Sequence, residues 1–163
     1  MIVRVSLLAS VPFLIGLVGC SMPGSAPTTP SRAYSQARNL PASGVALEGY
    51  CPVAYFAVNK PVRGQAKYAA DHDGVTYYLV SADARKSFVE DPQKYVPAYG
   101  GWCAFGMSVE DKFPVDPTNF KIVNGKLHVF LRNNGIDALE LWNKGNEPTL
   151  KQKADRHWKR VRS

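Results

Sequence analysis

The chain has 163 residues, of which 45% are apolar, and a formal net charge of +7 at neutral pH. This length suits one compact domain with a modest core. Beyond the N-terminal residues no apolar run is long enough to cross a bilayer, so the composition excludes a second membrane span.

Residues 1–19 are predicted to be a signal peptide. Arg4 gives a positive start, and the apolar run from Val5 to Val18 is too short to span a bilayer comfortably. The run ends in Leu17-Val18-Gly19-Cys20, which resembles a bacterial lipobox. The resemblance implies cleavage before Cys20 and acylation of its sulfur and amine, which anchors the chain in a membrane. An uncleaved anchor or ordinary secretion is the alternative.

The same resemblance implies a location. Because Ser21, and not an aspartate, follows the lipidated cysteine, lipoprotein sorting would deliver the protein to the outer membrane, facing the periplasm. Residues 20–43 are then the lipidated cysteine and a flexible tether, since this stretch is rich in Pro, Ser, Thr, Ala and Gly. The folded domain is predicted to occupy residues 44–163.

Strands and helices are expected to alternate along this domain. In chain order we expect an extended segment at 50–58, hairpin strands at 65–72 and 75–80, a helix from Ser81 to about Val89, a second helix start near Asp116-Pro117, hairpin strands at 120–123 and 126–131, a helix at 134–143 and a basic helix at 148–161. Ser81 has the character of an N-cap, and Asp91-Pro92 ends the first helix.

A short motif occurs twice in this order. Gly49-Tyr50-Cys51 and Gly101-Trp102-Cys103 are each glycine, aromatic and cysteine, and the second lies 52 residues after the first. Each is followed, 22 or 23 residues after its cysteine, by the glycine of a two-residue turn, Asp73-Gly74 or Asn124-Gly125. The sequence therefore predicts a small α+β domain of two pseudo-repeated β-hairpin–helix units plus a C-terminal basic helix. Superposing the units places Tyr77 on His128 and Phe88 on Leu139.

Several of these stretches resemble a known family. The segments A-L-E-G-Y-C-P-V-A-Y-F at 46–56, H-D-G-V-T-Y-Y at 72–78, D-P-Q-K-Y-V-P-A-Y-G-G-W-C-A-F-G at 91–106 and N-G-K-L at 124–127 are similar to bacterial YHS-domain proteins, in particular to their exported branch. YHS domains are small α+β modules that are described as metal-binding and occur beside proteins that handle copper and other heavy metals. The resemblance therefore implies an envelope-anchored metal-binding lipoprotein with copper or zinc as cofactor.

The candidate metal ligands are Cys51, Cys103, Met107 and His72. Thiolates bind Cu(I) and Zn(II), and a thioether favours Cu(I). Cys103 and Met107 are four residues apart, so their sulfurs lie together if that stretch is helical. No Cys-x-x-Cys or His-x-x-x-His pattern accompanies them. Core packing for Met107 and a surface turn for His72 therefore remain alternatives.

A second function stays open beside the metal site. In an oxidising compartment Cys51 and Cys103 could instead form a disulfide that closes a loop of about 50 residues. The protein would then be a non-enzymatic, disulfide-stabilised interaction module of the envelope. By resemblance, Cys51 lies where many YHS proteins carry Asp, which argues against a disulfide shared by the family.

The sequence argues against an enzyme. It contains no G-x-S-x-G motif, no P-loop and no dinucleotide fingerprint, and it lacks the Cys-x-x-Cys of a thiol oxidoreductase. Seven Lys or Arg lie between Lys144 and Arg162, against Glu147 and Asp155. This segment predicts contact with anionic lipid or envelope glycan, or else a solvated helix face. Nucleic acid is not an expected partner of an exported protein.

Overall fold

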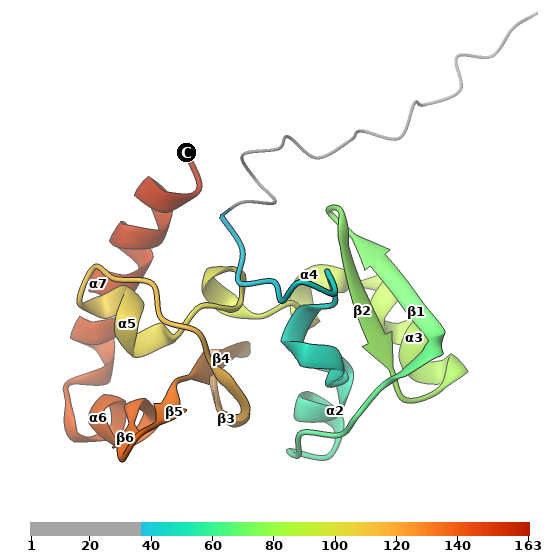
Figure 1. Cartoon of the computed structure of the whole chain (residues 1–163), viewed down its shortest axis with the longest axis horizontal. Coiled ribbons are helices and arrows are strands. Elements are labelled where there is room, and N and C mark those ends of the chain that lie inside the picture. The colour runs from blue at the N-terminus through green and yellow to red at the C-terminus, as the bar shows by residue number, and fades with distance from the viewer. Residues whose placement is uncertain (1–36) are drawn as a thin grey trace, which may run out of the picture.

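The computed structural model describes residues 37–163, which form a small α+β domain that ends in a long C-terminal helix (Figure 1). The predicted signal peptide, Cys20 and most of the predicted tether lie outside the described residues. In the part described, no helix is both long and apolar enough to cross a bilayer.

The first half of the domain is built around one hairpin. A 3-10 turn η1 (Ala46–Gly49) leads into the short helix α2 (Pro52–Ala57), and strands β1 (Gln65–His72) and β2 (Val75–Leu79) then pair antiparallel. Helices α3 (Ala82–Glu90) and α4 (Pro92–Tyr95) follow. Ser81 caps α3 by accepting the Ala84 N–H at 3.1 Å, as predicted.

The second half has the same order with two additions. The turn η2 (Ala98–Gly101), helix α5 (Ala104–Ser108) and antiparallel strands β3 (Asp116–Val123) and β4 (Lys126–Phe130) match η1, α2, β1 and β2. A small extra hairpin, β5 (Arg132–Asn133) and β6 (Ile136–Asp137), precedes helix α6 (Ala138–Lys144). Helix α7 (Glu147–Val161) ends the chain. The predicted fold class of two hairpin–helix units with a C-terminal helix is confirmed.

The strand registers of the two hairpins agree position by position. Ala70 pairs with Tyr77 in the first hairpin, and Lys121 pairs with His128 at the corresponding place in the second. Tyr77 and His128 are therefore equivalent, as the superposition predicted. The equivalent of Phe88 is Trp142, however, and not Leu139. Phe88 packs on Tyr77 with ring centroids 4.9 Å apart and Trp142 packs on His128 at 5.9 Å, because the extra hairpin shifts α6 along the chain.

Three local predictions are wrong. Residues 50–58 are not extended, because Cys51 acts as an N-cap and Pro52 occupies the first helical position of α2. Asp116-Pro117 does not start a helix. The Asp116 carboxylate accepts the backbone N–H of Thr118 at 2.8 Å inside β3. The helix expected from residue 134 begins only at Ala138, after the extra hairpin.

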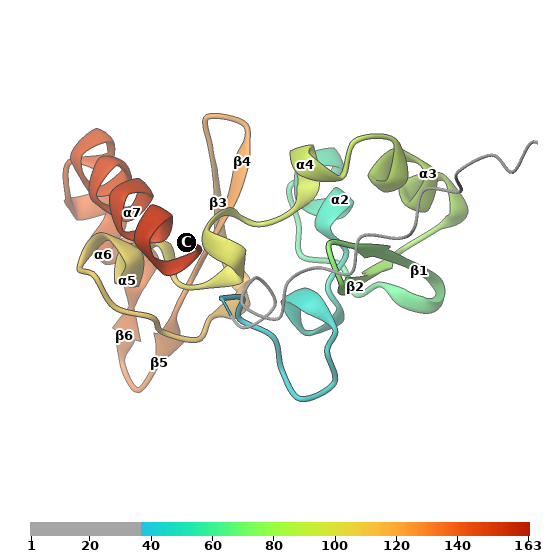
Figure 2. The same ribbon diagram turned by 90° about the horizontal axis from the view of Figure 1, so that it is seen from above.

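The two halves each have a core, and a third cluster joins them. Leu47 and Tyr55 of the first half pack with Leu127 and Val129 of β4. Tyr55 also donates a hydrogen bond to the Pro117 carbonyl at 2.9 Å and contacts the Phe120 ring at 4.8 Å. Figure 2 shows the halves side by side, with α2 and α4 of the first half turned toward β3 and β4 of the second.

Residues 37–41 form a strap across the junction of the halves. The Asn39 N–H donates to the Gly100 carbonyl at 3.0 Å, and the Trp102 indole N–H donates to the Ala37 carbonyl at 2.7 Å. The side chain of Asn39 donates to the Gly101 carbonyl at 3.0 Å. Residues 37–41, which lie within the segment that composition assigned to the tether, therefore pack against the domain.

Candidate functional site

The repeated glycine–aromatic–cysteine motif builds the same backbone structure twice. Three consecutive residues have positive φ in each copy: Leu47, Glu48 and Gly49 in η1, and Tyr99, Gly100 and Gly101 in η2. The aromatic residue then ends the turn and the cysteine occupies the N-cap position of the next helix, where the Cys103 sulfur, but not that of Cys51, accepts a backbone N–H. This reversal explains the glycines, since a left-handed run strains any residue with a Cβ.

Each cysteine has an equivalent backbone bond and is fully buried. The Cys51 N–H donates to the Val62 carbonyl at 2.8 Å, and the Cys103 N–H donates to the Phe113 carbonyl at 3.1 Å. Both side chains are 0% exposed, and both are free thiols in the structure. They lie in different cores, Cys51 in the cluster of the first half and Cys103 in the cluster of the second.

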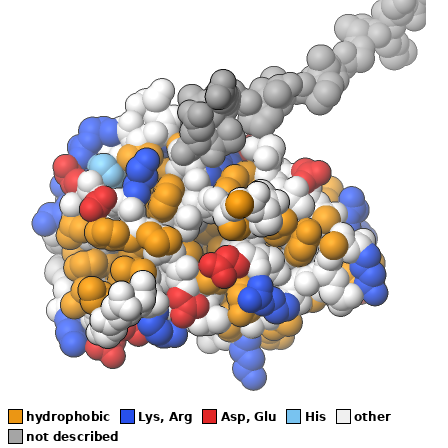
Figure 3. All heavy atoms as spheres, viewed as in Figure 1, with side chains coloured by type: hydrophobic (Ala, Val, Ile, Leu, Met, Phe, Trp, Pro, Cys, Tyr) orange, Lys and Arg blue, Asp and Glu red, His pale blue; other side chains and the backbone are white. Residues whose placement is uncertain are grey.

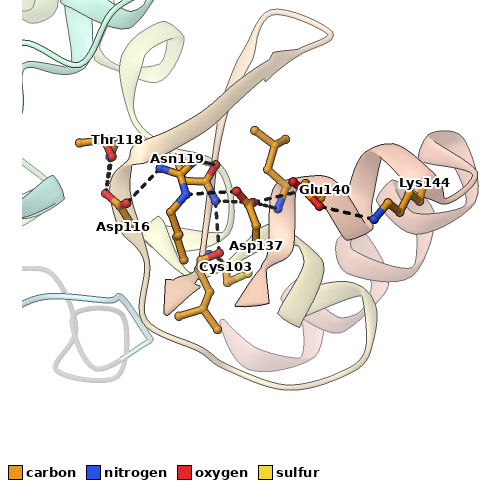
Figure 4. A network of polar contacts seen from close by, with 10 residues as sticks. Cys103, Asp116, Thr118, Asn119, Asp137, Glu140 and Lys144 are labelled. Carbon is orange, nitrogen blue, oxygen red and sulfur yellow. Dashed lines mark hydrogen bonds and ion pairs between the residues drawn. The ribbon is translucent and has the colours of Figure 1, made fainter. Parts of the chain in front are cut away.

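The Cys103 sulfur belongs to a structural network around β4 and α6 (Figure 4). It accepts the backbone N–H groups of Leu131 at 3.3 Å and Gly106 at 3.5 Å. Buried Asn119 donates to the Leu131 carbonyl at 3.2 Å and to Asp137 at 2.9 Å, and Asp137 caps α6. Burial raises the pKa of the Cys103 thiol, with the backbone donors opposing it, so the neutral thiol is the form present near neutral pH.

The structure does not bring the four predicted metal ligands together. Cys103 and Met107 share the core of the second half and are one turn apart, with the Met107 N–H bonded to the Cys103 carbonyl at 2.9 Å. Cys51 lies in the other core. His72 is at the end of β1, bonded to the side chain of Gln93 at 3.0 Å and 3.3 Å from Asp73. Over residues 37–163, no three His, Cys, Asp or Glu side chains are grouped to hold a metal ion.

A cavity of about 270 Å³ lies between the halves. Tyr77 of the first hairpin and His128 of the second both line it, so the equivalent positions of the repeat face one space. The strap, α4, η2 and α7 also contribute to the lining. The lining residues are Arg38, Tyr77, Gln93, Val96, Pro97, Ala98, Tyr99, Gly100, Lys126, His128, Lys151, Asp155, Trp158 and Arg162.

The cavity lining is basic and aromatic. Four cations line it: Arg38 of the strap, Lys126 of β4, Lys151 of α7 and Arg162 directly after α7. Arg38 also pairs with Asp73 at 3.3 Å, and the one carboxylate of the lining itself is that of Asp155. This carboxylate is already engaged: it accepts the Tyr99 hydroxyl at 3.0 Å and the Lys151 ammonium at 2.7 Å. Burial, followed by the Asp155 charge, raises the pKa of Tyr99, so its hydroxyl stays protonated as a donor. The cavity thus offers net positive charge and flat apolar walls.

His128 is held in one tautomer. Its Nδ1 donates to the Lys126 carbonyl at 3.0 Å, and its ring packs against Tyr99 and Trp142 at centroid distances of 5.4 and 5.9 Å. Burial lowers the pKa of this imidazole, so it is neutral near neutral pH. The Nε2 atom then carries the lone pair and is available as an acceptor.

This cavity was not predicted from the sequence. The superposition of Tyr77 on His128 was the one signal that pointed toward it, since both residues line the cavity. The contributions of Arg38, Lys126 and α7 come from distant segments and left no local pattern.

Comparison of the chain with family models, with curated proteins and with solved structures finds no match in any of the three.

Proposed function

We propose that this protein is a non-enzymatic binding module of the cell envelope whose central cavity takes a small organic anion. The observation that carries the proposal is the lining of the cavity, in which four cations lie beside the rings of Tyr77, Tyr99 and Trp158. Two carboxylates, Asp73 and Asp155, pair with two of these cations, so the positive charge remains in excess. Cations and N–H donors hold a carboxylate or phosphate group through charge-assisted hydrogen bonds, and aromatic walls bury a flat body. The volume suits a ligand of about one ring.

The same lining favours binding over catalysis. It contains no serine or cysteine nucleophile among the described residues, and its one carboxylate is already bonded to Tyr99 and Lys151. His128 has no carboxylate partner at Nδ1, because that nitrogen donates to a backbone carbonyl. A nucleophile and an oriented base, which covalent catalysis requires, are therefore not assembled here.

The test uses residues 21–163, which contain every described element, and two matched probes. Benzoate and benzamide have the same ring and nearly the same shape but differ in charge. We expect benzoate to raise the unfolding temperature in a concentration-dependent manner and benzamide to have little effect. Equal responses to the two probes would contradict an anion site.

A pair of α7 variants tests the location of this site. Arg162, the C-cap residue of α7, lines the cavity, whereas Lys159 is an exposed cation of the helix that does not. Removing one charge-assisted contact should weaken benzoate binding about 10-fold in Arg162→Gln and leave it unchanged in Lys159→Gln. Calorimetric titration measures both, and an unchanged affinity in Arg162→Gln would place the anion elsewhere.

Soft-metal binding is the second candidate, favoured by the pairing of Cys103 with Met107 on one turn of α5 inside one core. It is the function that the resemblance to YHS-domain proteins implies. The four predicted ligands do not fit a single site, so this candidate reduces to a thiolate–thioether pair, which suits Cu(I). Binding would have to displace the proton of the buried Cys103 thiol.

Cys51 provides the matched control for that candidate, because it is an equally buried helix cap in the other core. In a Cu(I) titration of the reduced protein, Cys103→Ser and Met107→Leu should each lower the affinity, while Cys51→Ser should not. Equal affinity in all three variants would eliminate the pair as a metal site.

A further inference from the structure

We infer that the exposed face of α7 docks on an anionic lipid surface, at the end of the domain where the chain enters from its predicted membrane anchor. This inference goes beyond the cavity and does not require it to be occupied. Three observations support it. One face of α7 is positively charged, other sides of the same helix pack on the core and line the cavity, and the first described residues lie close to the helix.

The docking face consists of Lys153, Arg156, Lys159 and Arg160, all exposed. Their spacing of three and four residues gathers them on one side of a helix that is about 22 Å long. Within the described residues, Lys153, Arg156 and Lys159 make no ion pair. Arg160 binds Glu110 at 2.7 Å and also approaches the ring of His157 at 3.4 Å. One carboxylate therefore offsets four cations.

A different side of α7 serves the fold. Ala154 is fully buried in the core of the second half, and Leu150 and Trp158 pack beside it. Lys151, Asp155, Trp158 and Arg162 recur at intervals of three or four residues along the side that lines the cavity. Apart from the Arg160–Glu110 pair, the basic face thus has no ion-pair partner within residues 37–163. It lies next to the cavity side around the circumference of the helix.

The chain enters the domain beside this helix. Gly100 of η2 lies between Arg38 of the strap and the ring of Trp158, because a Cβ placed there would approach their atoms at 3.2 and 2.7 Å. Figures 1 and 2 agree in showing the first described residues close to the C-terminal end of α7. In Figure 3, Lys and Arg side chains lie near that end of the helix together with acidic side chains and a histidine.

These positions favour a membrane over other polyanions. An anchor at Cys20 would hold the first described residues near the bilayer and so raise the local concentration of anionic headgroups around α7. Clustered cations next to a membrane each add a similar electrostatic increment to binding, which salt screens. The domain would then rest on α7 with the cavity mouth close to the lipid surface.

The test measures sedimentation of residues 21–163 with phosphatidylcholine vesicles, with or without phosphatidylglycerol. We expect binding only to vesicles that contain phosphatidylglycerol, and its loss at raised salt. The triple variant Lys153→Gln, Arg156→Gln, Lys159→Gln should partition about 100-fold more weakly. The matched variant Lys60→Gln, Lys67→Gln, Lys86→Gln removes the same charge from exposed sites of the first half and should bind as the parent chain does.

A second measurement keeps the inference testable if a variant folds poorly. In the lipidated full chain on phosphatidylglycerol vesicles, acetylation of Lys153 and Lys159 should slow several-fold relative to Lys60 and Lys67. Equal labelling, equal effects of the two triple variants, or binding to polyphosphate without binding to vesicles would each overturn the inference. Benzoate binding should be unaffected by the α7 triple variant, so failure of the docking face and failure of the cavity are distinguishable.

Discussion

At the scale of single residues, Gly100 is where the strap, η2 and α7 converge. Its φ of +60° is left-handed, and a Cβ would lie 2.7 Å from the Trp158 ring and 3.3 Å from the Arg38 Cα. Gly125, in the second hairpin turn, has a similar φ of +71° with nothing within 4 Å of a Cβ. Comparing alanine substitutions at these two glycines therefore distinguishes the cost of left-handed backbone strain from the cost of steric crowding.

We expect Gly125→Ala to lower the free energy of unfolding by about 1 kcal/mol, from left-handed strain alone. Gly100→Ala should cost about 2–4 kcal/mol, because overpacking adds to that strain. Urea unfolding of the two variants measures the difference. Equal losses would show that the strap and Trp158 move apart without cost.

The buried imidazole of His128 should make the free energy of unfolding depend on pH. Burial lowers its pKa below the ordinary value of 6.5, so the unfolded chain binds a proton at this residue before the folded chain does. The free energy of unfolding should therefore be fully retained above pH 6.5 and fall as pH drops toward the folded-state pKa, by at most about 1.4 kcal/mol per pH unit. The lowered pKa values of Glu110, Asp137 and Glu147 act in a separate window below their ordinary values of 3.8 to 4.5.

The variant for this test is His128→Tyr, since Tyr77 occupies the equivalent register position. The difference in free energy of unfolding between this variant and the parent should change as the pH falls through the ordinary histidine pKa of 6.5, and should be constant well above it. A constant difference over the whole range would mean that the imidazole keeps an ordinary pKa in the folded protein.

At the scale of elements, the helix caps differ in how much else depends on them. Ser81 accepts one N–H bond at the start of α3. Asp137 accepts two at the start of α6 and also binds Asn119 and Arg132. Ser81→Ala should cost about 1 kcal/mol of stability. Asp137→Ala should cost about 2–3 kcal/mol, because it also leaves the buried Asn119 amide short of an acceptor.

Thermal unfolding with a common reference buffer compares these two cap variants. Asp137→Asn is the useful intermediate, since it keeps a capping oxygen but removes the charge that Arg132 contacts. We expect its stability to lie between that of the parent and that of Asp137→Ala. Equal losses for Ser81→Ala and Asp137→Ala would contradict the network drawn in Figure 4.

The elements that sequence predicted correctly are those with strong local signals. Asp73-Gly74 and Asn124-Gly125 each adopt positive φ at both positions and turn a hairpin between strand-forming residues. The segment at 50–58 was predicted to be extended because its β-branched and aromatic residues are typical of a strand. It forms α2 instead, since Pro52 is favourable at the first helical position. Asn134-Gly135 carried a third hairpin signal, which the helical spacing after it obscured.

At the scale of the whole molecule, the duplication could be predicted from the sequence but the cavity could not. Two cysteines at equivalent places suggested one shared site, yet each caps a helix in its own half and lies in a separate core. The cavity arises between the halves, where the strap, β4 and α7 meet residues of the first hairpin. Such a lining depends on how the halves pack, and no spacing along the chain encodes it.

The position of α7 also determines which changes to the basic segment remove charge without unfolding the domain. Ala154 is fully buried, and the Trp142 indole donates to Glu147 at 2.9 Å, so α7 completes the core of the second half. Deleting residues 147–163 should therefore abolish cooperative unfolding rather than remove only a charged surface. Deleting residues 162 and 163, which follow α7, should leave the unfolding transition intact.

Near-ultraviolet circular dichroism and urea unfolding measure this contrast. The longer deletion should lose the fixed environment of Trp142 and any sharp transition, whereas the shorter one should keep both. The same reasoning makes glutamine substitution on the exposed side of α7 the appropriate way to remove charge, because Lys153, Arg156 and Lys159 do not contribute to the core. A sharp transition in the longer deletion would show that the second half folds without α7, and that the basic helix is an appendage of the domain.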